Sequence, residues 1–543
     1  MTRLQTMRAE IASWKARVAA GLAARPLLRG RFADAGLLGA ITAIHLIFAR
    51  AFLFGAFGFD EQYFLYEGFA LGKGMIPYRD FQEFKPPLIF LLNMLALKIF
   101  GLDQMHFRRF FLLLSLAAFL VVAVALLSRG VPRLVILGAT ALMLNTFLDL
   151  RFLEGGTLDS SESAGLWFFL LGVGVLLFKV PRPAWQRWQQ WTGGLLLALA
   201  PLAKEPFCFP TLLAWGTLAL LADVELDDRS AAGARRRFVK NTALAAIAVG
   251  ALWLLYMLVT RSFGAYLANL RETMTYSAEH DIMYGVFPKL GFWGTWGENL
   301  HRLRSTYVNP SFLTPFLPYF LAALLLWRRR PISMAAGVVA TFLGALYGVT
   351  IGHGFFGHYF IIAMTGSFFA TALGCLAIGE RASQLPPPWR RWLGASLALM
   401  ALYSLQPRLD QDWEQWDARH PAPPAASPKL VRLVDARTGP GDTIWSVGMP
   451  AIYFYADRRA GSRIPYVHDS LLHLYPGRTA AEKLATFRAE LDVKMPKLVI
   501  LDEGRAGREQ HMDLLISPFL RDHGYQLITG PDAAGVPVYQ RPY

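Results

Sequence analysis

The sequence predicts an α-helical membrane protein with about eleven spanning helices and a small C-terminal α/β domain. Three observations lead to this fold class. Of the 543 residues, 54% are hydrophobic and only 17% are charged, whereas about a quarter of the residues in soluble domains are charged. Apolar segments long enough to cross a bilayer recur along residues 35–405. After residue 428 they give way to the short patterns of strands and helices.

The net charge of +15 reflects membrane topology rather than a nucleic-acid surface. The basic residues fall in short loops between apolar segments, as cytoplasmic loops require. Nucleic acid is therefore excluded as a partner. The two cysteines, Cys208 and Cys375, both lie in apolar segments, so no disulfide framework is implied.

Residues 1–34 form a basic leader that we place in the cytoplasm. The apolar segment that follows is long enough to span, so it is an uncleaved first span rather than a signal peptide. The stretch 193–222 is interrupted at 203–206 and predicts two short spans. The other predicted spans are 37–57, 106–128, 132–148, 163–179, 241–260, 310–327, 331–351, 358–378 and 391–405.

The apolar run 88–100 has only 13 residues, whereas a span needs about 20. If it crossed the bilayer, Arg129 and Arg133 would move outside and every later basic loop would invert. We therefore expect 88–100 to be interfacial or re-entrant, with the N-terminus inside and the C-terminus outside. The predicted outer loops are 58–105, 149–162, 203–206, 261–309 and 352–357.

The C-terminal part is a separate unit. Residues 406–428 are rich in proline and predict a linker. Residues 429–543 predict an extracytoplasmic, periplasmic α/β domain with helices near 478–492 and 511–523. Its expected strands are 443–447, 498–501, 525–528 and 536–539.

The outer loop 58–105 carries the main candidates for chemistry. Asp60 and Glu61 stand where the first span ends, and Lys85, Pro86 and Pro87 open the next apolar helix. Carboxylates at a membrane edge indicate function, although an acid at a helix end is also ordinary. A helix start favours anions, and the prolines lack N–H donors, so Lys85 must supply most of the binding. The alternative for Lys85 is a lysine that snorkels to the interface.

This order of residues resembles the first outer loop of GT-C type membrane glycosyltransferases. The most similar families are the protein mannosyltransferase-like enzymes and the lipid A aminoarabinose transferases. The resemblance implies a donor sugar on a polyprenyl phosphate and an acceptor outside the cytoplasm. It implies an inverting displacement in which Asp60 serves the acceptor and Glu61 orients the site. Lys85 would hold the phosphate that leaves.

Weaker resemblances to these families single out further acidic and basic residues. Arg79 is a second candidate cation in the same loop. Asp159 and Glu162 both qualify as the acid that precedes the fourth span, and we favour Asp159. Lys204 matches a lysine that faces the carrier lipid, although it could instead pair with Glu205 and close a tight hairpin.

His358 and Tyr359 match a pattern at the top of a late span. A packed or solvated histidine is the alternative, and the histidines here have neither the spacing nor the acidic partner of a metal site. No metal ligand is predicted, and a divalent metal cofactor is left open. The segment 450–463 resembles part of these enzymes' outer domains, which cover the site and shape acceptor access.

Together these features predict a multi-pass enzyme of the inner (plasma) membrane that acts in cell-envelope glycan synthesis. Its partners would be the donor lipid, an extracytoplasmic acceptor and membrane lipids. Two other classes are weighed against it. A flippase for lipid-linked sugars usually has repeated halves, and we find no repeat. An O-antigen ligase or polymerase favours paired arginines in large outer loops. The sequence specifies neither the sugar nor the acceptor.

Overall fold

The computed structural model describes most of the chain. The described residues are 26–54, 58–83, 85–101, 104–148, 158–180, 182–224, 228–279, 291–302, 314–327, 331–350, 359–417, 426–465, 475, 479–501, 510–529 and 536–542. The predicted site residue His358 and most of the basic leader lie outside them.

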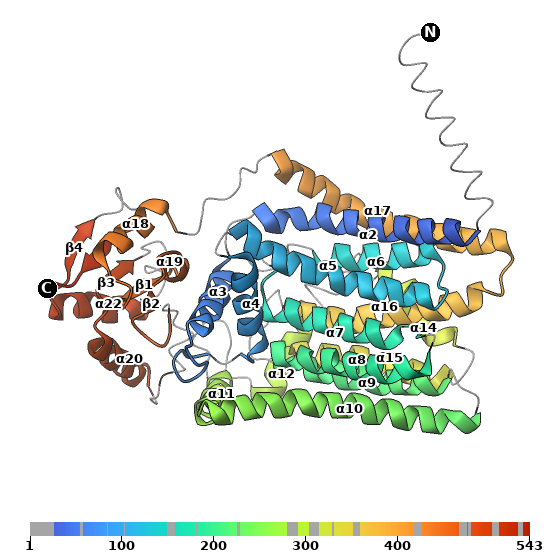
Figure 1. Cartoon of the computed structure of the whole chain (residues 1–543), viewed down its shortest axis with the longest axis horizontal. Coiled ribbons are helices and arrows are strands. Elements are labelled where there is room, and N and C mark those ends of the chain that lie inside the picture. The colour runs from blue at the N-terminus through green and yellow to red at the C-terminus, as the bar shows by residue number, and fades with distance from the viewer. Residues whose placement is uncertain are drawn as a thin grey trace, which may run out of the picture.

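Long helices lie side by side in a bundle, and a small α/β domain sits at one end of it (Figure 1). Helix α16 is central and almost wholly buried. Helix α10 is mostly exposed, with Leu252, Leu255 and Leu258 facing outward, as expected of a helix in contact with lipid. The bundle helices are α2 (Pro26–Phe54), α5 (Gln104–Ser128), α6 (Arg133–Phe147), α7 (Ser161–Leu177), α8 (Pro183–Ala203), α9 (Cys208–Val224), α10 (Asp228–Val259), α14 (Leu317–Leu325), α15 (Pro331–Thr350), α16 (Phe360–Ala382) and α17 (Pro387–Asp417).

Each predicted apolar segment overlaps a helix of this bundle. Within the described residues, six helices are long and apolar enough to cross a membrane, so the chain is a membrane protein. The exact count of eleven spans stays a prediction. Helix α17 continues to Asp417, so the first part of the predicted linker is helical. Arg408, Leu409, Gln411, Glu414 and Gln415 favour a helix there, although the same stretch contains Pro407.

Helices α3 (Phe59–Gly72) and α4 (Leu88–Phe100) lie across the end of the bundle that faces the α/β domain (Figure 1). They pack closely because Gly68 has no side chain: a Cβ there would come within 2.5 Å of the Asn93 Cβ. Helix α4 thus does not run along the bundle, which agrees with its prediction as a segment that does not cross. The short helices α11 (Phe263–Glu279), α12 (Gly291–Arg302), η2 (Glu205–Phe207) and η4 (Thr314–Phe316) connect bundle helices.

A topology experiment tests the sidedness of α4. A reporter fused after Leu102 is expected outside the cytoplasm, and one fused after Arg129 inside, because a 13-residue helix is too short to span. Alkaline phosphatase and green fluorescent protein fusions at both positions give the measurement. A cytoplasmic signal at Leu102 would contradict the assignment and place residue 159 on the wrong face.

The C-terminal domain contains a five-stranded sheet in the order β2-β1-β3-β5-β4. Strand β1 is parallel to β2 and β3, whereas β5 is antiparallel to β3 and β4. The strands are β1 (Thr443–Val447), β2 (Arg459–Ala460), β3 (Leu498–Leu501), β4 (Gln526–Thr529) and β5 (Val538–Gln540), and the helices are α18 (Pro428–Arg437), α19 (Ala451–Tyr455), α20 (Ala480–Lys494) and α22 (Gln510–Asp522). Strands β1 and β3 have the expected bounds, β4 and β5 overlap the expected strands 525–528 and 536–539, and α18, α19 and β2 have no counterpart among the expected elements.

Candidate active site

The N-terminus of α3 places Asp60 and Glu61 in its first turn, where the helix dipole favours acidic side chains. Their environments differ. Asp60 is half-buried, whereas Glu61 is 1% exposed. Arg108 of α5 donates to both Glu61 carboxylate oxygens at 2.7 Å, and the backbone N–H of Gly58 donates to Glu61 Oε2 at 3.2 Å. Glu61 is thus held by a buried bidentate ion pair, which suits the orienting role implied by the resemblance.

Truncating Arg108 tests this pair. The Arg108→Leu variant leaves the Glu61 carboxylate buried without its cation, a situation that typically lowers stability by about 3–5 kcal/mol. The neighbouring Arg109 is exposed, so Arg109→Leu is a matched control that should change stability by less than about 0.5 kcal/mol. Thermal unfolding of the purified protein in detergent measures both. Equal melting temperatures for the two variants would show that the pair does not stabilise the loop.

Asp159 lies just before α7 and comes close to the same ion pair. Ser160 caps α7 by accepting from the Ser163 N–H at 3.1 Å, which leaves Asp159 outside the first turn. Asn93 of α4 donates to Asp159 Oδ1 at 2.9 Å. Burial raises the pKa of Asp159 well above its usual range, and the charges of Glu61 and Asp60 raise it further. These effects favour the neutral form of the Asp159 carboxyl over its ionised form.

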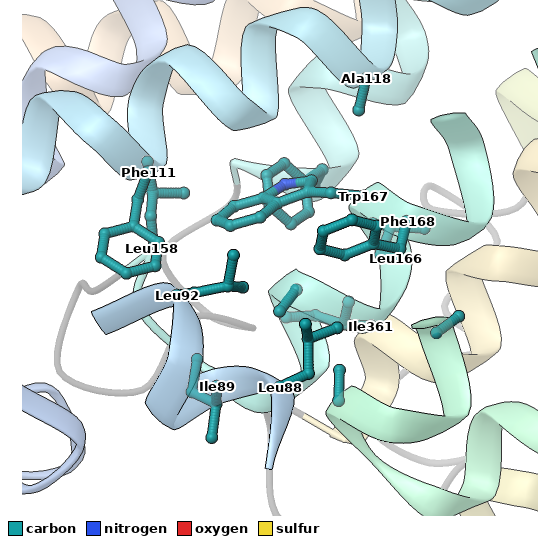
Figure 2. Close-up of a cluster of buried hydrophobic side chains, with 14 of the residues drawn as sticks. Leu88, Ile89, Leu92, Phe111, Ala118, Leu158, Leu166, Trp167, Phe168 and Ile361 are labelled. Carbon is teal, nitrogen blue, oxygen red and sulfur yellow. The ribbon is translucent and has the colours of Figure 1, made fainter. Parts of the chain in front are cut away.

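A packed apolar layer fixes these helices beneath the polar groups. Figure 2 shows its residues from α4, α5, α7 and α16, with the Trp167 ring at the centre. A cavity of about 10 Å³ remains beside it, close to the room that one water molecule needs. The cavity is lined by Phe52, Leu53, Glu61, Arg108, Phe111, Leu158 and Asp159.

Lys85 is positioned by the loop between α3 and α4. Tyr78 has a φ of 69°, an uncommon conformation for a bulky residue, and its hydroxyl donates to the Lys85 carbonyl at 2.8 Å. The Lys85 N–H donates to Glu83 Oε1 at 3.0 Å. The Lys85 ammonium lies 4.4 Å from the centre of the Phe64 ring. Backbone contacts on both sides therefore hold this lysine in place.

The charges around Lys85 come from several elements. Burial lowers the pKa of Lys85, and the carboxylates of Glu83, Asp60 and Glu162 raise it by more, so that the net shift is upward. Lys204 opposes them with its own positive charge. Lys85 thus stays protonated and lies within electrostatic reach of Asp60, the predicted base.

Lys204, Glu162 and Tyr359, which the sequence analysis considers separately, lie together around a second lysine ammonium. Lys204 forms a buried ion pair with Glu162, and its ammonium lies 3.9 Å from the centre of the Tyr359 ring. The Ser161 hydroxyl donates to Glu162 Oε2 at 3.0 Å. The alternative of a Lys204–Glu205 pair is wrong, because Lys204 bonds to Glu162 instead and Glu205 is exposed.

Arg79 is not brought to this group by its described contacts. It is exposed, pairs with Asp80 at 2.8 Å, and donates to the Thr260 carbonyl at 3.2 Å. These contacts tie the loop to the end of α10. No group of three or more His, Cys, Asp or Glu side chains among the described residues is placed to hold a metal ion.

The C-terminal domain rests on the same loop. Ala451 N–H donates to Gln62 Oε1 at 3.3 Å, and Ala460 N–H donates to the Tyr66 hydroxyl at 3.2 Å, both on α3. The Gln82 N–H donates to the Arg463 carbonyl at 3.0 Å. The segment 450–463, which the sequence singled out, thus contributes to the surface that contacts α3.

Neither a protein-family model nor a curated protein matches the chain. Among solved structures, ArnT from Cupriavidus metallidurans bound to undecaprenyl phosphate matches with a TM-score of 0.52 and 11% identity, over 93% of this chain and 98% of ArnT. The chain has a GT-C type fold. The fold implied by the resemblance is thereby confirmed.

Two oligosaccharyltransferase structures from Archaeoglobus fulgidus also match this chain. One, of AglB in complex with an inhibitory peptide and a dolichol-phosphate, has 12% identity and a TM-score of 0.49 over 94% of this chain and 74% of AglB. The other, a complex with Zn and sulfate, has 13% identity and a TM-score of 0.46 over 92% and 73% of the two chains.

Proposed function

We propose that the protein transfers a sugar from a polyprenyl-phosphate donor to an acceptor outside the cytoplasm. The observation that carries the proposal is the convergence of Asp60, Lys85, Glu162 and Lys204 at one end of the bundle. A base and two cations near a membrane edge suit a reaction in which a lipid phosphate leaves. The GT-C type fold shared with ArnT, whose structure contains undecaprenyl phosphate, adds support.

The reaction is an inverting displacement. The acceptor hydroxyl oxygen forms a bond to the anomeric carbon of the sugar while the bond from that carbon to the phosphate oxygen breaks. Asp60 takes the hydroxyl proton. The phosphate keeps the bonding electrons and gains negative charge, which the fixed cation of Lys85 stabilises. Lys204, held by Glu162 and Tyr359, places a second cation within reach of the same group.

The neighbouring acids have supporting roles in this scheme. Burial and the charges of Glu61 and Asp60 favour the neutral form of Asp159, so we assign Asp60 as the base and Asp159 as a neutral hydrogen-bonding group. Glu61 keeps the start of α3 in place through Arg108. The C-terminal domain, which we place in the periplasm, covers the loop and shapes acceptor access.

Mass spectrometry of cell-surface glycans, glycoproteins and carrier lipids tests the proposal. Cells without the protein are expected to lose one sugar modification and to accumulate its lipid-linked donor on the outer leaflet. Wild-type protein should restore the modification, whereas Asp60→Asn should not. Accumulation on the inner leaflet would indicate a flippase instead, and unchanged glycans and lipids would overturn the proposed function.

A further inference from the structure

Two buried glutamates near Lys85, Glu67 and Glu83, have no role in the proposed transfer reaction. Glu67 lies in the middle of α3 and Glu83 in the loop that leads to Lys85, and both side chains are 0% exposed. Glu83 is tied down at two atoms: its Oε1 accepts from the Lys85 N–H at 3.0 Å, and its carbonyl accepts from Asn269 Nδ2 at 3.0 Å. Glu83 therefore cannot turn away from Glu67 without moving the loop.

The buried carboxyl groups of Glu67 and Glu83 lie within hydrogen-bonding reach of each other. Two buried carboxylates in contact cannot both ionise. Burial raises the pKa of Glu67 well above its usual range, and repulsion from Glu83 adds to this effect. Lys85 and Tyr63 act in the opposite direction but do not cancel it. A single lysine cation balances one negative charge, so one proton on the pair makes the buried group neutral overall.

We propose that Glu67 and Glu83 share one proton, and that Glu67 is thereby a positioning residue for the phosphate-binding lysine. The role in phosphate binding rests on the proposed function. With the proton present, the pair carries one negative charge and Lys85 attracts a further anion. When the proton is lost, two negative charges hold the Lys85 ammonium and compete with the phosphate.

The direction of the pH effect follows from this scheme. As the pH rises through the pKa of the pair, the second carboxylate ionises and phosphate binding weakens. Helices α4 and α19 pack against α3 but add no charge near the pair: α4 carries only the exposed Lys98, and α19 carries no charged residue. Charged and titratable groups of other elements do act on the pair and on Lys85. The groups that face the pair or Lys85 are Asp60, Tyr63, Tyr66, Tyr78, Glu162, Lys204 and Glu205.

Infrared spectroscopy of the protein without ligand tests the shared proton. A protonated carboxyl has a carbonyl band that a carboxylate lacks, and the spectrum of Asp159→Asn identifies the contribution of Asp159. The Glu67→Gln variant is expected to lose a second protonated-carboxyl band at neutral pH, since Glu83 alone beside Lys85 ionises. Glutamine is uncharged and similar in size, so the fold is retained. A band that is unchanged in Glu67→Gln would overturn the shared proton, whatever the enzyme does.

Binding of undecaprenyl phosphate from pH 7 to 10 tests the positioning role. Wild-type affinity should fall by roughly tenfold more than that of Glu67→Gln, the effect expected of one added charge a few ångströms away. Glu67→Asp should retain the pH dependence, and Glu205→Gln, which removes an exposed carboxylate near Lys85, should leave it unchanged. Because neighbouring carboxylates raise the pKa of Lys85, Glu67→Gln should lose the Lys85 proton at a lower pH than the wild type. The difference between the two proteins therefore reports the pair only below the pH at which Lys85 is deprotonated in the variant.

The outcomes separate the two claims. If Lys85→Ala weakens binding as expected but the wild type and Glu67→Gln share one pH dependence, the positioning role is overturned and the proposed function stands. If the wild type binds no undecaprenyl phosphate, or Lys85→Ala binds it equally well, the phosphate-binding function fails and the positioning role fails with it. The infrared result decides the shared proton in either case.

Discussion

Replacing Asp60 by asparagine is expected to lower sugar transfer by about 10²–10⁴-fold, the usual contribution of a positioned base. Asparagine keeps the size of the side chain but cannot accept the hydroxyl proton. Membrane insertion and donor binding should be unchanged. Asp60→Glu should recover little activity, because one added methylene moves the carboxylate by about 1 Å, which matters at a reacting centre.

The measurement is the single-turnover rate of sugar transfer in vesicles that are reconstituted with the purified protein and with carrier lipids extracted from the native membrane. Asp80→Asn is a matched control: it neutralises another carboxylate of the same outer loop, where asparagine can still accept from the Ile76 N–H. Full activity in Asp60→Asn would remove the centre of the proposed mechanism. If the acceptor group is already anionic, no base is needed. The loss of transfer rate in Asp60→Asn would then be smaller and would reflect only the positioning of the acceptor by Asp60.

Removing the Lys85 ammonium is expected to weaken carrier-phosphate binding by about 10–100-fold, since hydrogen bonds to charged groups contribute about 1.5–3 kcal/mol. Turnover should fall as well, because the same cation stabilises charge that develops on the leaving group. Lys85→Arg should keep part of both, as arginine retains the charge without the compact geometry.

Lys98 provides the control for this prediction. It lies at the exposed far end of α4, so Lys98→Ala changes the charge of the same helix without reaching the site. Equilibrium binding of undecaprenyl phosphate and the transfer rate are measured for each variant. Equal affinity and rate in the wild type and Lys85→Ala would support the alternative of a snorkelling lysine.

Local pattern was enough to predict most of the architecture. The apolar runs gave the bundle helices, because helices in lipid need only length and hydrophobicity. Short apolar runs predicted β1 and β3 at their observed bounds. Helix α19 and strand β2 have five and two residues, which is too short for a periodic signal. Their structure depends on contacts with α3 and β1 rather than on local preference.

The candidate site was predictable residue by residue but not as an arrangement. The sequence singled out Glu162, Lys204 and Tyr359 from separate loops, and only the packing of α7, α8 and α16 brings them together. Arg108 was missed because an arginine at the start of an apolar helix resembles an ordinary span end. Its partner Glu61 lies 47 residues away.

The buried glutamates illustrate a second limit. Glu67 stands among residues of an outer loop, where an acid is expected to be solvated. Its burial arises because α4 packs against α3 through Gly68 and because the α/β domain covers α3 at Gln62 and Tyr66. Neither contact can be predicted from the sequence of hydrophobic and polar residues around residue 67.

The contact between α3 and the C-terminal domain has a consequence for biogenesis. Gln62 and its partner Ala451 are 389 positions apart, so a ribosome completes the bundle helices long before the covering domain exists. Until that domain has folded, Gln62 and Tyr66 lack these partners. Under the proposed function, the covered form of α3 would be completed only after the C-terminal domain is made, so a partly synthesised chain would present an uncovered site.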